Sequence, residues 1–223
     1  MRLMPLPDPV AGEIEVHRLD LDLLIEPRDA LALLSEDERA RVARFVRRAD
    51  RVRFARTRAA LRQLLARRLD CAPAQVRIDR APQGKPFAVN GPRFNASHAG
   101  AYALIAIGVG ARIGEVGIDI ESEDRALDMP ALLPHAFSAR ECEELVAAPD
   151  PGAAALRRWV AKEAVLKAVG VGIADHLRAI AVRPGPGAAL AVRGQPAAWG
   201  EVGAVAIAAP TGYQAALAWQ WRE

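Results

Sequence analysis

The order of predicted elements is the same in both halves of this chain of 223 residues. In each half a helical segment is followed by short strands, and each strand is bounded by Gly, Pro or Asn. The halves share no residue-by-residue repeat. Hydrophobic residues make up 52% of the chain, which is enough to bury a substantial core. We therefore expect two similar lobes, residues 1–112 and 113–223, with a cleft between them.

The helical part of the first half is strongly cationic. Twelve arginines and one acid, Asp50, lie between Arg39 and Arg68, which gives the segment a local charge of +11 in a chain of net charge +3. Ser35 is followed by three acids, as at a helix N-terminus, and apolar residues recur at helical spacing. These residues predict a cationic, amphipathic pair of helices. Such a face is usually only solvated, but uncompensated charge also favours nucleic acid, a nucleotide phosphate or an acidic protein.

Short strands are expected next in the first half, at residues 76–79, 84–89, 94–98 and 102–109. Ser97 and His98 end one of them, where a hydroxyl and an imidazole could both contact a phosphate. A lone histidine more often has only a structural role. There is no fitting acid and no nucleophile elbow for a Ser-His hydrolase, so Ser97 is not interpreted as a nucleophile.

Apolar and acidic residues alternate from Val116 to Glu121 with the period of a half-buried strand. Val116, Ile118 and Ile120 then face a core, while Asp119 and Glu121 project from the opposite face. Two adjacent carboxylates repel each other unless a cation lies between them, so the pattern indicates a hard divalent ion such as magnesium. The alternative is a solvated edge strand with two surface acids.

Lysine is rare: Lys85, Lys162 and Lys167 are the three lysines among 30 basic residues. An ammonium releases its proton when its surroundings favour the neutral form, whereas a guanidinium essentially does not, so two lysines in one short run indicate chemistry. On a helix, Trp159, Glu163 and Lys167 share one face. The simpler alternative is an exposed helix with a Glu-Lys pair. Glu163 also adds a third carboxylate to the two acids of the predicted strand.

The remaining elements of the second half follow from local signals. A loop is expected at residues 122–134, and Ser138 with Glu141 forms a capping box at a helix start. The helix that carries Lys167 is expected to end near Gly170. Strands are then expected at residues 179–183, 188–193, 202–208 and 213–219.

Several protein classes are excluded by composition. Cys71 and Cys142 lack the number and spacing of a disulfide framework or a zinc site, so we expect buried free thiols in a cytoplasmic protein. Prolines interrupt the first nine residues before an apolar run develops, so these residues are not interpreted as a secretory signal. The longest apolar stretch, residues 101–110, is too short to cross a bilayer.

Five motifs in this order resemble those of the Sfp-type 4′-phosphopantetheinyl transferases. They are Gly84-Lys85-Pro86, Phe94-Asn95-Ala96-Ser97-His98, Gly117-Ile118-Asp119-Ile120-Glu121, Phe137-Ser138-Ala139-Arg140-Glu141, and the run from Trp159 to Lys167. The resemblance implies a magnesium-dependent enzyme that transfers the phosphopantetheine arm of coenzyme A to a serine of an apo acyl or peptidyl carrier protein and releases adenosine 3′,5′-bisphosphate. It also implies a pseudo-twofold α+β monomer, each lobe a helix packed on a small, largely antiparallel sheet, with no nucleic-acid or membrane partner.

The resemblance assigns roles residue by residue. Asp119, Glu121 and Glu163 match the metal ligands, and Glu163 is also the expected base for the carrier serine, directly or through water. Lys167 matches the lysine that neutralises the pyrophosphate and protonates the departing bisphosphate. Coenzyme A contacts are implied for Lys85 near the adenine, Arg41 at the 3′-phosphate, and Ser97, His98 and Lys167 at the remaining phosphates.

Two positions depart from the family pattern. Glu38 lies where the family often has a second base, so Arg44 or Arg53 is expected to complete the contact with the 3′-phosphate. Ala96 is smaller than the usual residue at its position.

Two other classes stay open from the residues alone. A magnesium-dependent nuclease or phosphatase could use the same three carboxylates, but it would not explain Gly84-Lys85-Pro86 or the doubled layout. A nucleic-acid-binding module could use the arginine helices, although the strands show little aromatic interleaving for base stacking. Which carrier protein is modified cannot be read from this sequence.

Overall fold

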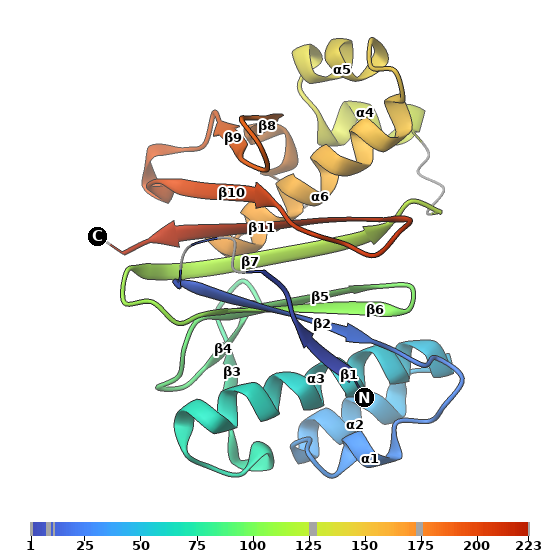
Figure 1. The fold of residues 1–223 in the computed structure, drawn as a ribbon, viewed down its shortest axis with the longest axis vertical. Coiled ribbons are helices and arrows are strands. Elements are labelled where there is room, and N and C mark those ends of the chain that lie inside the picture. Colours follow the sequence, from blue (N-terminus) through green and yellow to red (C-terminus); the bar gives the residue numbers. More distant parts are fainter. Residues whose placement is uncertain (1, 8–9, 11, 125–128, 173–175, 223) are drawn as a thin grey trace.

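The computed structural model describes residues 2–7, 10, 12–124, 129–172 and 176–222. Four layers form the molecule: a helix, two facing sheets and a second helix (Figure 1). The outer helices are α3 (Arg48–Leu69) and α6 (Pro151–Val169). The sheets have the orders β1-β2-β6-β5 and β10-β11-β7, with antiparallel pairing throughout both. Their strands are β1 (Arg2–Pro5), β2 (Ile14–Asp20), β5 (Phe94–Ala99), β6 (Tyr102–Gly108), β7 (Ile113–Ser122), β10 (Val202–Ala206) and β11 (Tyr213–Trp221).

Three hydrophobic clusters lie between the four layers. Alternation along β6 sends Ile105 towards Leu61 of α3 and sends Leu104 into a core shared by the two sheets. Ile118 of β7 contributes to the same shared core, and Val165 of α6 belongs to the cluster that covers the other face of the second sheet. The two sheets are therefore in direct contact through their inner faces, where the sequence predicted a cleft.

Local capping signals are confirmed at three helix ends. Ser35 caps α2 (Glu36–Arg44) in a capping box with Glu38, and Ser138 caps α5 (Ala139–Val146) in the same way with Glu141. Helix α6 ends at Gly170, whose φ of 82° lies in the left-handed region that glycine enters without strain.

The smaller elements complete the chain. They are α1 (Arg28–Leu31), the short 3₁₀ helices Pro73–Gln75, Leu177–Ala179 and Ala197–Trp199, the hairpin β3 (Ile78–Arg80) and β4 (Pro86–Ala88), α4 (Met129–Ala136), and the hairpin β8 (Ala181–Pro184) and β9 (Leu190–Arg193). The structure corrects the predicted loop at residues 122–134, because its second part is α4. Prolines suggested a loop there, but Pro130 lies in the first helical turn, where no backbone N–H is required. Residues 125–128 of that predicted loop lie outside the described residues.

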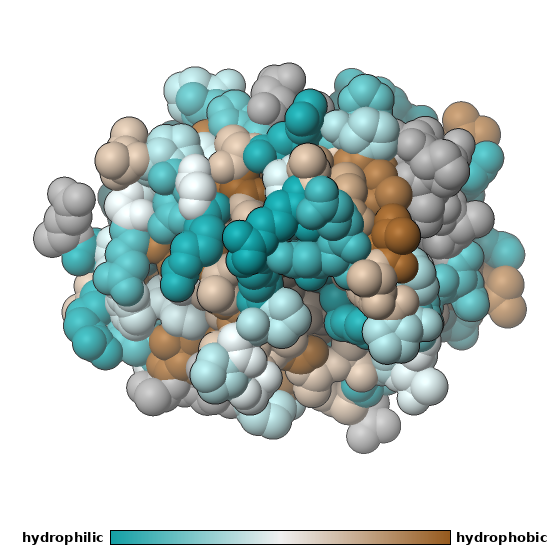
Figure 2. Space-filling model, turned by 90° about the horizontal axis from the view of Figure 1, so that it is seen from above, coloured by the Kyte–Doolittle hydropathy of each residue, from teal (hydrophilic) through white to brown (hydrophobic). Residues whose placement is uncertain are grey.

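Figure 2 shows the end of the molecule that carries α5, with hydrophilic side chains across its centre. Glu144 of α5 forms ion pairs with Arg140, Arg158 and Arg183. No helix among the described residues is long and apolar enough to cross a membrane. The predicted α+β fold, with a long helix packed on each of two small antiparallel sheets, is confirmed. The boundary near residue 112 stays a prediction.

Candidate active site

Strand β7 carries the acidic pair in the predicted orientation. Val116, Ile118 and Ile120 lie in the core between the sheets, whereas Asp119 is on the opposite face and only 1% exposed. That face is covered by α6, because a Cβ at Gly117 would collide with the backbone of Ala164. The alternative of a solvated edge strand with surface acids is therefore wrong for Asp119.

Helix α6 and strand β5 bring three more predicted residues to Asp119. The Lys167 Nζ lies 2.5 Å from Asp119 Oδ1 and 3.3 Å from Glu163 Oε2. The Ser97 hydroxyl donates a hydrogen bond of 2.7 Å to the same Asp119 oxygen. Residues from two sheets and one helix thus form a single polar cluster of Ser97, Asp119, Glu163 and Lys167.

Asn95 fixes the two sheets relative to each other beside this cluster. Its side-chain oxygen accepts a hydrogen bond of 3.0 Å from the backbone N–H of Ile118, in a buried position. Asn95 and Ser97 are two residues apart on β5, and Ile118 and Asp119 are adjacent on β7. Side chains of β5 therefore bond to β7 where no backbone ladder joins the two strands. Asn95 is a site residue missed from the sequence, although it lies within the motif Phe94-Asn95-Ala96-Ser97-His98.

Burial and charge shift the pKa values inside the cluster. Burial raises the pKa of Glu163, the negative charges of Asp119 and Glu121 raise it further, and Lys167 opposes them. Burial acts to lower the pKa of Lys167, but Asp119 and Glu163 outweigh it, so the net pKa is raised. Lys167 is consequently a cation throughout the neutral range, and Glu163 is a stronger proton acceptor than an ordinary carboxylate.

The donor set fits a hard divalent cation. Asp119 Oδ2 is buried and has no hydrogen-bond partner among the described residues, and a carboxylate oxygen in that state favours a cation. Asp119 and Glu121 both lie near enough to Glu163 to raise its pKa, so three carboxylates are available to such a cation. Within the described part of the chain, no three acidic, His or Cys side chains converge as a finished metal site. The Lys167 ammonium instead lies between Asp119 and Glu163.

Cationic groups continue from this cluster towards α3. Arg53 donates a hydrogen bond of 2.8 Å to the carbonyl oxygen of Gly100, in the turn after β5, and one of 2.9 Å to the Asp50 carboxylate. His98 is exposed over part of its surface, but the protein around its ring removes water from it. This desolvation lowers the pKa of His98, and the positive charges of Arg53 and Lys167 lower it further. The charges of Arg53 and Lys167 therefore both act on His98.

A second group of cations lines a pocket of about 770 Å³ between α2, α3 and the β3–β4 hairpin. We call it the arginine pocket; its cations are Arg41, Arg44, Arg58 and Arg80, and its rings are Phe54 and Phe87. The Arg41 guanidinium stacks 4.7 Å from the centre of the Phe54 ring. Burial lowers the pKa of Arg41, and the charges of Arg80 and Arg44 lower it further.

Two residues of the arginine pocket were missed from the sequence. Arg58 is 13% exposed at its side chain, and its Nη1 is buried without a hydrogen-bond partner among the described residues. Arg80 lies outside the arginine-rich helices, and the β3–β4 hairpin brings it to the pocket. No local signal marks Arg80, because its position depends on packing between distant segments.

Acidic residues from outside the arginine run neutralise much of its charge, which corrects the expectation of uncompensated charge. Glu38 is paired with both Arg58 and Arg62, so it has a structural role where the family often has a base. Arg62 is only 2% exposed and also donates to the carbonyl oxygens of Pro73 and Val76. The other pairs with acids from outside the run are Arg51–Glu26, Arg56–Asp29 and Arg68–Glu15, and Asp50 within the run pairs with Arg53.

Two lysines lie apart from the polar cluster. The Lys85 ammonium donates to Glu115 and to the carbonyl oxygens of Val116 and Ala168, so its donors are used within the protein. The predicted contact with adenine is therefore available to its aliphatic stem only. Lys162 is fully buried beside Glu141, on the other side of α6 from Asp119. Burial lowers the pKa of Lys162, and Glu141 opposes this shift.

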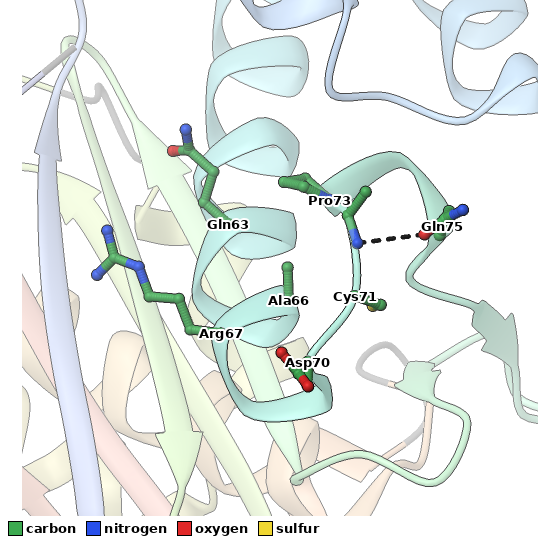
Figure 3. Close-up of a pocket in the computed structure, with 8 residues that line it drawn as sticks. Gln63, Ala66, Arg67, Asp70, Cys71, Pro73 and Gln75 are labelled. Carbon is green, nitrogen blue, oxygen red and sulfur yellow. Dashed lines mark hydrogen bonds between the residues drawn. The ribbon is translucent and has the colours of Figure 1, made fainter.

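A separate depression lies at the end of α3, far along the helix from Arg53. Figure 3 shows it, with a volume of about 600 Å³, between Gln63, Arg67 and Asp70 on one side and Pro73 and Gln75 on the other. None of the predicted site residues lines it. Cys71 borders it, and both cysteines are free and half-buried, so the expectation of fully buried thiols is wrong.

The comparisons with known proteins agree with this geometry. The model of the 4′-phosphopantetheinyl transferase superfamily matches residues 115–218, and that of the 4′-phosphopantetheinyl transferase N-terminal region matches residues 26–109. The chain is 37% identical to the 4′-phosphopantetheinyl transferase HetI of Nostoc, over 74% of this chain and 72% of HetI. It is 39% identical to a Synechocystis protein named for the same activity, over 67% of this chain and 62% of that protein, less than two thirds of its length. The chain belongs to the 4′-phosphopantetheinyl transferase superfamily.

Proposed function

We propose that this member of the superfamily transfers the 4′-phosphopantetheine arm of coenzyme A to a serine of an apo acyl or peptidyl carrier protein. The observation that carries the proposal is the cluster of Ser97, Asp119, Glu163 and Lys167, in which groups from both sheets meet at one buried carboxylate. The family membership supports the same reaction class. The carrier protein as acceptor and coenzyme A as donor are proposed on the basis of that membership.

Asp119, Glu121 and Glu163 would hold a magnesium ion. Bound there, the ion would polarise the pyrophosphate oxygens and stabilise the charge that develops on them. Two observations support this assignment: Asp119 Oδ2 has no hydrogen-bond partner in the described part of the chain, and all the donors are oxygen atoms. The Lys167 ammonium lies between Asp119 and Glu163, so it must leave them for a metal to be held by both.

Lys167, Ser97, His98 and Arg53 are suited to the pyrophosphate. Lys167 is protonated near neutrality, because its pKa is raised, so it brings both a positive charge and a proton to the pyrophosphate. Arg53 is held by Gly100 and Asp50, which leaves its remaining N–H groups for a phosphate oxygen. These residues bind and orient the phosphates so that the departing group leaves towards positive charge.

The arginine pocket is suited to the adenosine 3′-phosphate end of coenzyme A. Its guanidinium groups match the planar recognition of phosphate oxygens, and the Phe54 and Phe87 rings offer apolar surface to a base. The buried Arg58 Nη1, which has no hydrogen-bond partner within the residues that the structure describes, supports an anionic occupant. Arg41, Arg44, Arg58 and Arg80 are therefore the residues we assign to this phosphate, and Arg53 is assigned to the pyrophosphate.

The chemical step forms one bond and breaks one. The carrier serine oxygen bonds to the phosphorus attached to pantetheine, the bond from that phosphorus to the bridging oxygen breaks, and adenosine 3′,5′-bisphosphate leaves. Glu163 takes the serine proton, for which its raised pKa suits it. Lys167 is placed to give a proton to the departing phosphate oxygen.

Intact-mass spectrometry tests the proposal. An apo acyl carrier protein incubated with this protein, coenzyme A and magnesium should gain the mass of one phosphopantetheine group. Asp119→Ala should abolish the gain while the circular dichroism spectrum stays unchanged, and Asp124→Ala, at an exposed acid just after β7, should retain it. No mass gain with any acyl or peptidyl carrier, or full activity of Asp119→Ala, would refute the proposal.

A further inference from the structure

We propose that an exposed apolar patch bordered by arginines, next to the N-terminus of α3, docks the carrier protein through an acidic surface that presents an apolar side chain. We call it the Val46 patch; it consists of Leu24, Ile25 and Val46 with Arg28, Arg47 and Arg48. The inference rests on the proposed function, because it assumes that the second substrate is a protein.

The apolar side chains of the patch are unusually exposed. Val46 is 93% exposed, Leu24 is 75% and Ile25 is 55%. Across the described residues, two other large hydrophobic side chains are classed as exposed, Val109 and Val146. Three of five such residues therefore lie in one region, which marks an interaction surface more than scattered exposure does.

Arginines border these side chains. Arg28, Arg47 and Arg48 are exposed and form no ion pair with any residue in the described part of the chain. Glu26, which lies among them, is engaged by Arg51 at 2.7 Å, and its pKa is lowered by that hydrogen bond first and then by the charges of Arg51, Arg48 and Arg28. The local field is thus positive and complements an acidic partner.

Arg51 makes the patch a defined surface. It donates to both carboxylate oxygens of Glu26 and to the carbonyl oxygens of Phe45 and Val46. The segment after β2 and the linker between α2 and α3 are therefore held against each other. Phe45 also packs on Phe54 with ring centres 5.6 Å apart, which anchors the linker while Val46 projects into solvent.

The surface beside the patch is hollowed. A depression of about 470 Å³ is lined by apolar groups of Pro27, Leu31, Val42 and Ala43, by Arg28, Arg39 and Arg51, and by Glu26, which Arg51 neutralises. An apolar side chain projecting from a folded partner fills such a depression, whereas a lipid surface has no single protruding group to match it. This shape favours a protein partner over a membrane.

The patch lies within reach of the reaction centre. Arg47 and Arg53 are six residues apart along α3, which corresponds to about 9 Å of helix. Arg53 bonds to Gly100 in the turn that follows Ser97 and His98. The N-terminus of α3, that turn and the end of β7 lie on the same side of the molecule, at the right in Figure 1. A carrier seated on the patch therefore brings its serine loop to the carboxylates.

Steady-state kinetics with an apo acyl carrier protein of net negative charge tests the docking surface. Val46→Glu, and separately Arg47→Glu with Arg48→Glu, should raise the KM for the carrier at least about tenfold and leave the KM for coenzyme A within about twofold. Arg47→Lys with Arg48→Lys keeps both charges and should leave the KM for the carrier within about threefold of the wild-type value. Val146→Glu is the matched control, because Val146 is 70% exposed at the end of α5.

The outcomes separate the two proposals. If the wild type modifies no carrier, the proposed function fails and the docking proposal fails with it. If the wild type is active but Val46→Glu leaves the carrier KM unchanged, or Val146→Glu raises it equally, the docking proposal alone is overturned. The wild type could instead sediment with phosphatidylserine vesicles, and Val46→Glu could lose this binding while the KM for the carrier stays unchanged. That result would assign the patch to a membrane and would also overturn the docking proposal.

Discussion

Replacing Lys162 by methionine should destabilise the fold strongly. The Lys162 ammonium is 0% exposed and donates to Glu141 at 2.8 Å and to the carbonyl oxygens of Ala136 and Leu177 at 2.8 and 2.9 Å. It also lies 4.9 Å from the centre of the Phe137 ring. Methionine keeps most of the apolar stem but has no donor, so Lys162→Met leaves the Glu141 carboxylate buried without its counter-charge.

The expected size follows from this burial. Removing one partner of a buried ion pair costs about 3–5 kcal/mol, a large part of a domain stability of about 5–15 kcal/mol. For a chain of this length each kcal/mol corresponds to about 2–4 °C, so the Tm should fall by roughly 6–20 °C.

A double variant tests the cause of that loss. Glu141 also accepts hydrogen bonds from the backbone N–H groups of Ser138 and Val182. The double variant Lys162→Met with Glu141→Gln removes the unpaired charge and leaves an amide oxygen to accept a hydrogen bond from one of these two N–H groups. Its free energy of unfolding should therefore be higher than that of Lys162→Met alone by more than about 1 kcal/mol.

Guanidinium unfolding followed by circular dichroism measures Lys162→Met, Glu141→Gln and the double variant, with equal m-values as the condition for comparing them. The reasoning is refuted if Lys162→Met costs less than about 1 kcal/mol. It is also refuted if the double variant loses the sum of the two single losses, because additivity would mean that the two side chains do not interact.

Three further predictions concern other contacts. Asn95→Leu should lower stability by about 1–3 kcal/mol in the same unfolding assay, because it leaves the N–H of Ile118 buried and unpaired. Arg80→Ala should raise the KM for coenzyme A about tenfold or more but leave that for dephospho-coenzyme A within about twofold; equal effects on both donors would remove Arg80 from the 3′-phosphate. Burial acts to raise the pKa of Glu15, but the hydrogen bonds and charges of Arg68 and His17 together outweigh this, and the net pKa lies below its ordinary value of 4.5. The stabilisation is therefore complete above that value and is lost as the pH falls through the lowered pKa, so Glu15→Gln should flatten the acid side of the pH-stability curve.

Local signals were read correctly from the sequence because their causes are local. Each capping box joins residues three positions apart, as Ser35 with Glu38 and Ser138 with Glu141. The alternation from Val116 to Glu121 fixes which side chains share a face whatever the strand packs against. The fold class followed from these elements and from the motifs.

Contacts between distant segments could not be read in the same way. Glu38 neutralises Arg62 from 24 positions away, and Lys85 bonds to Ala168 across 83 positions. Helical periodicity placed Lys162 next to the helix face that carries Glu163. The packing of α4 and α5 on α6 is needed to show that the Lys162 ammonium is buried. The arginine pocket likewise depends on a hairpin that carries Arg80 to α2.

The pairing of β7 with β11 has a consequence for synthesis of the chain. β11 is the central strand of its sheet, yet it follows every other strand in the sequence, and β7 must wait for it before its backbone is paired on that side. Until β11 is made, Asp119 has no paired strand beside it, and the turn after β5 lacks its close approach to Tyr213. A ribosome-bound intermediate should therefore bind neither coenzyme A nor carrier, so that an incomplete chain does not sequester either one.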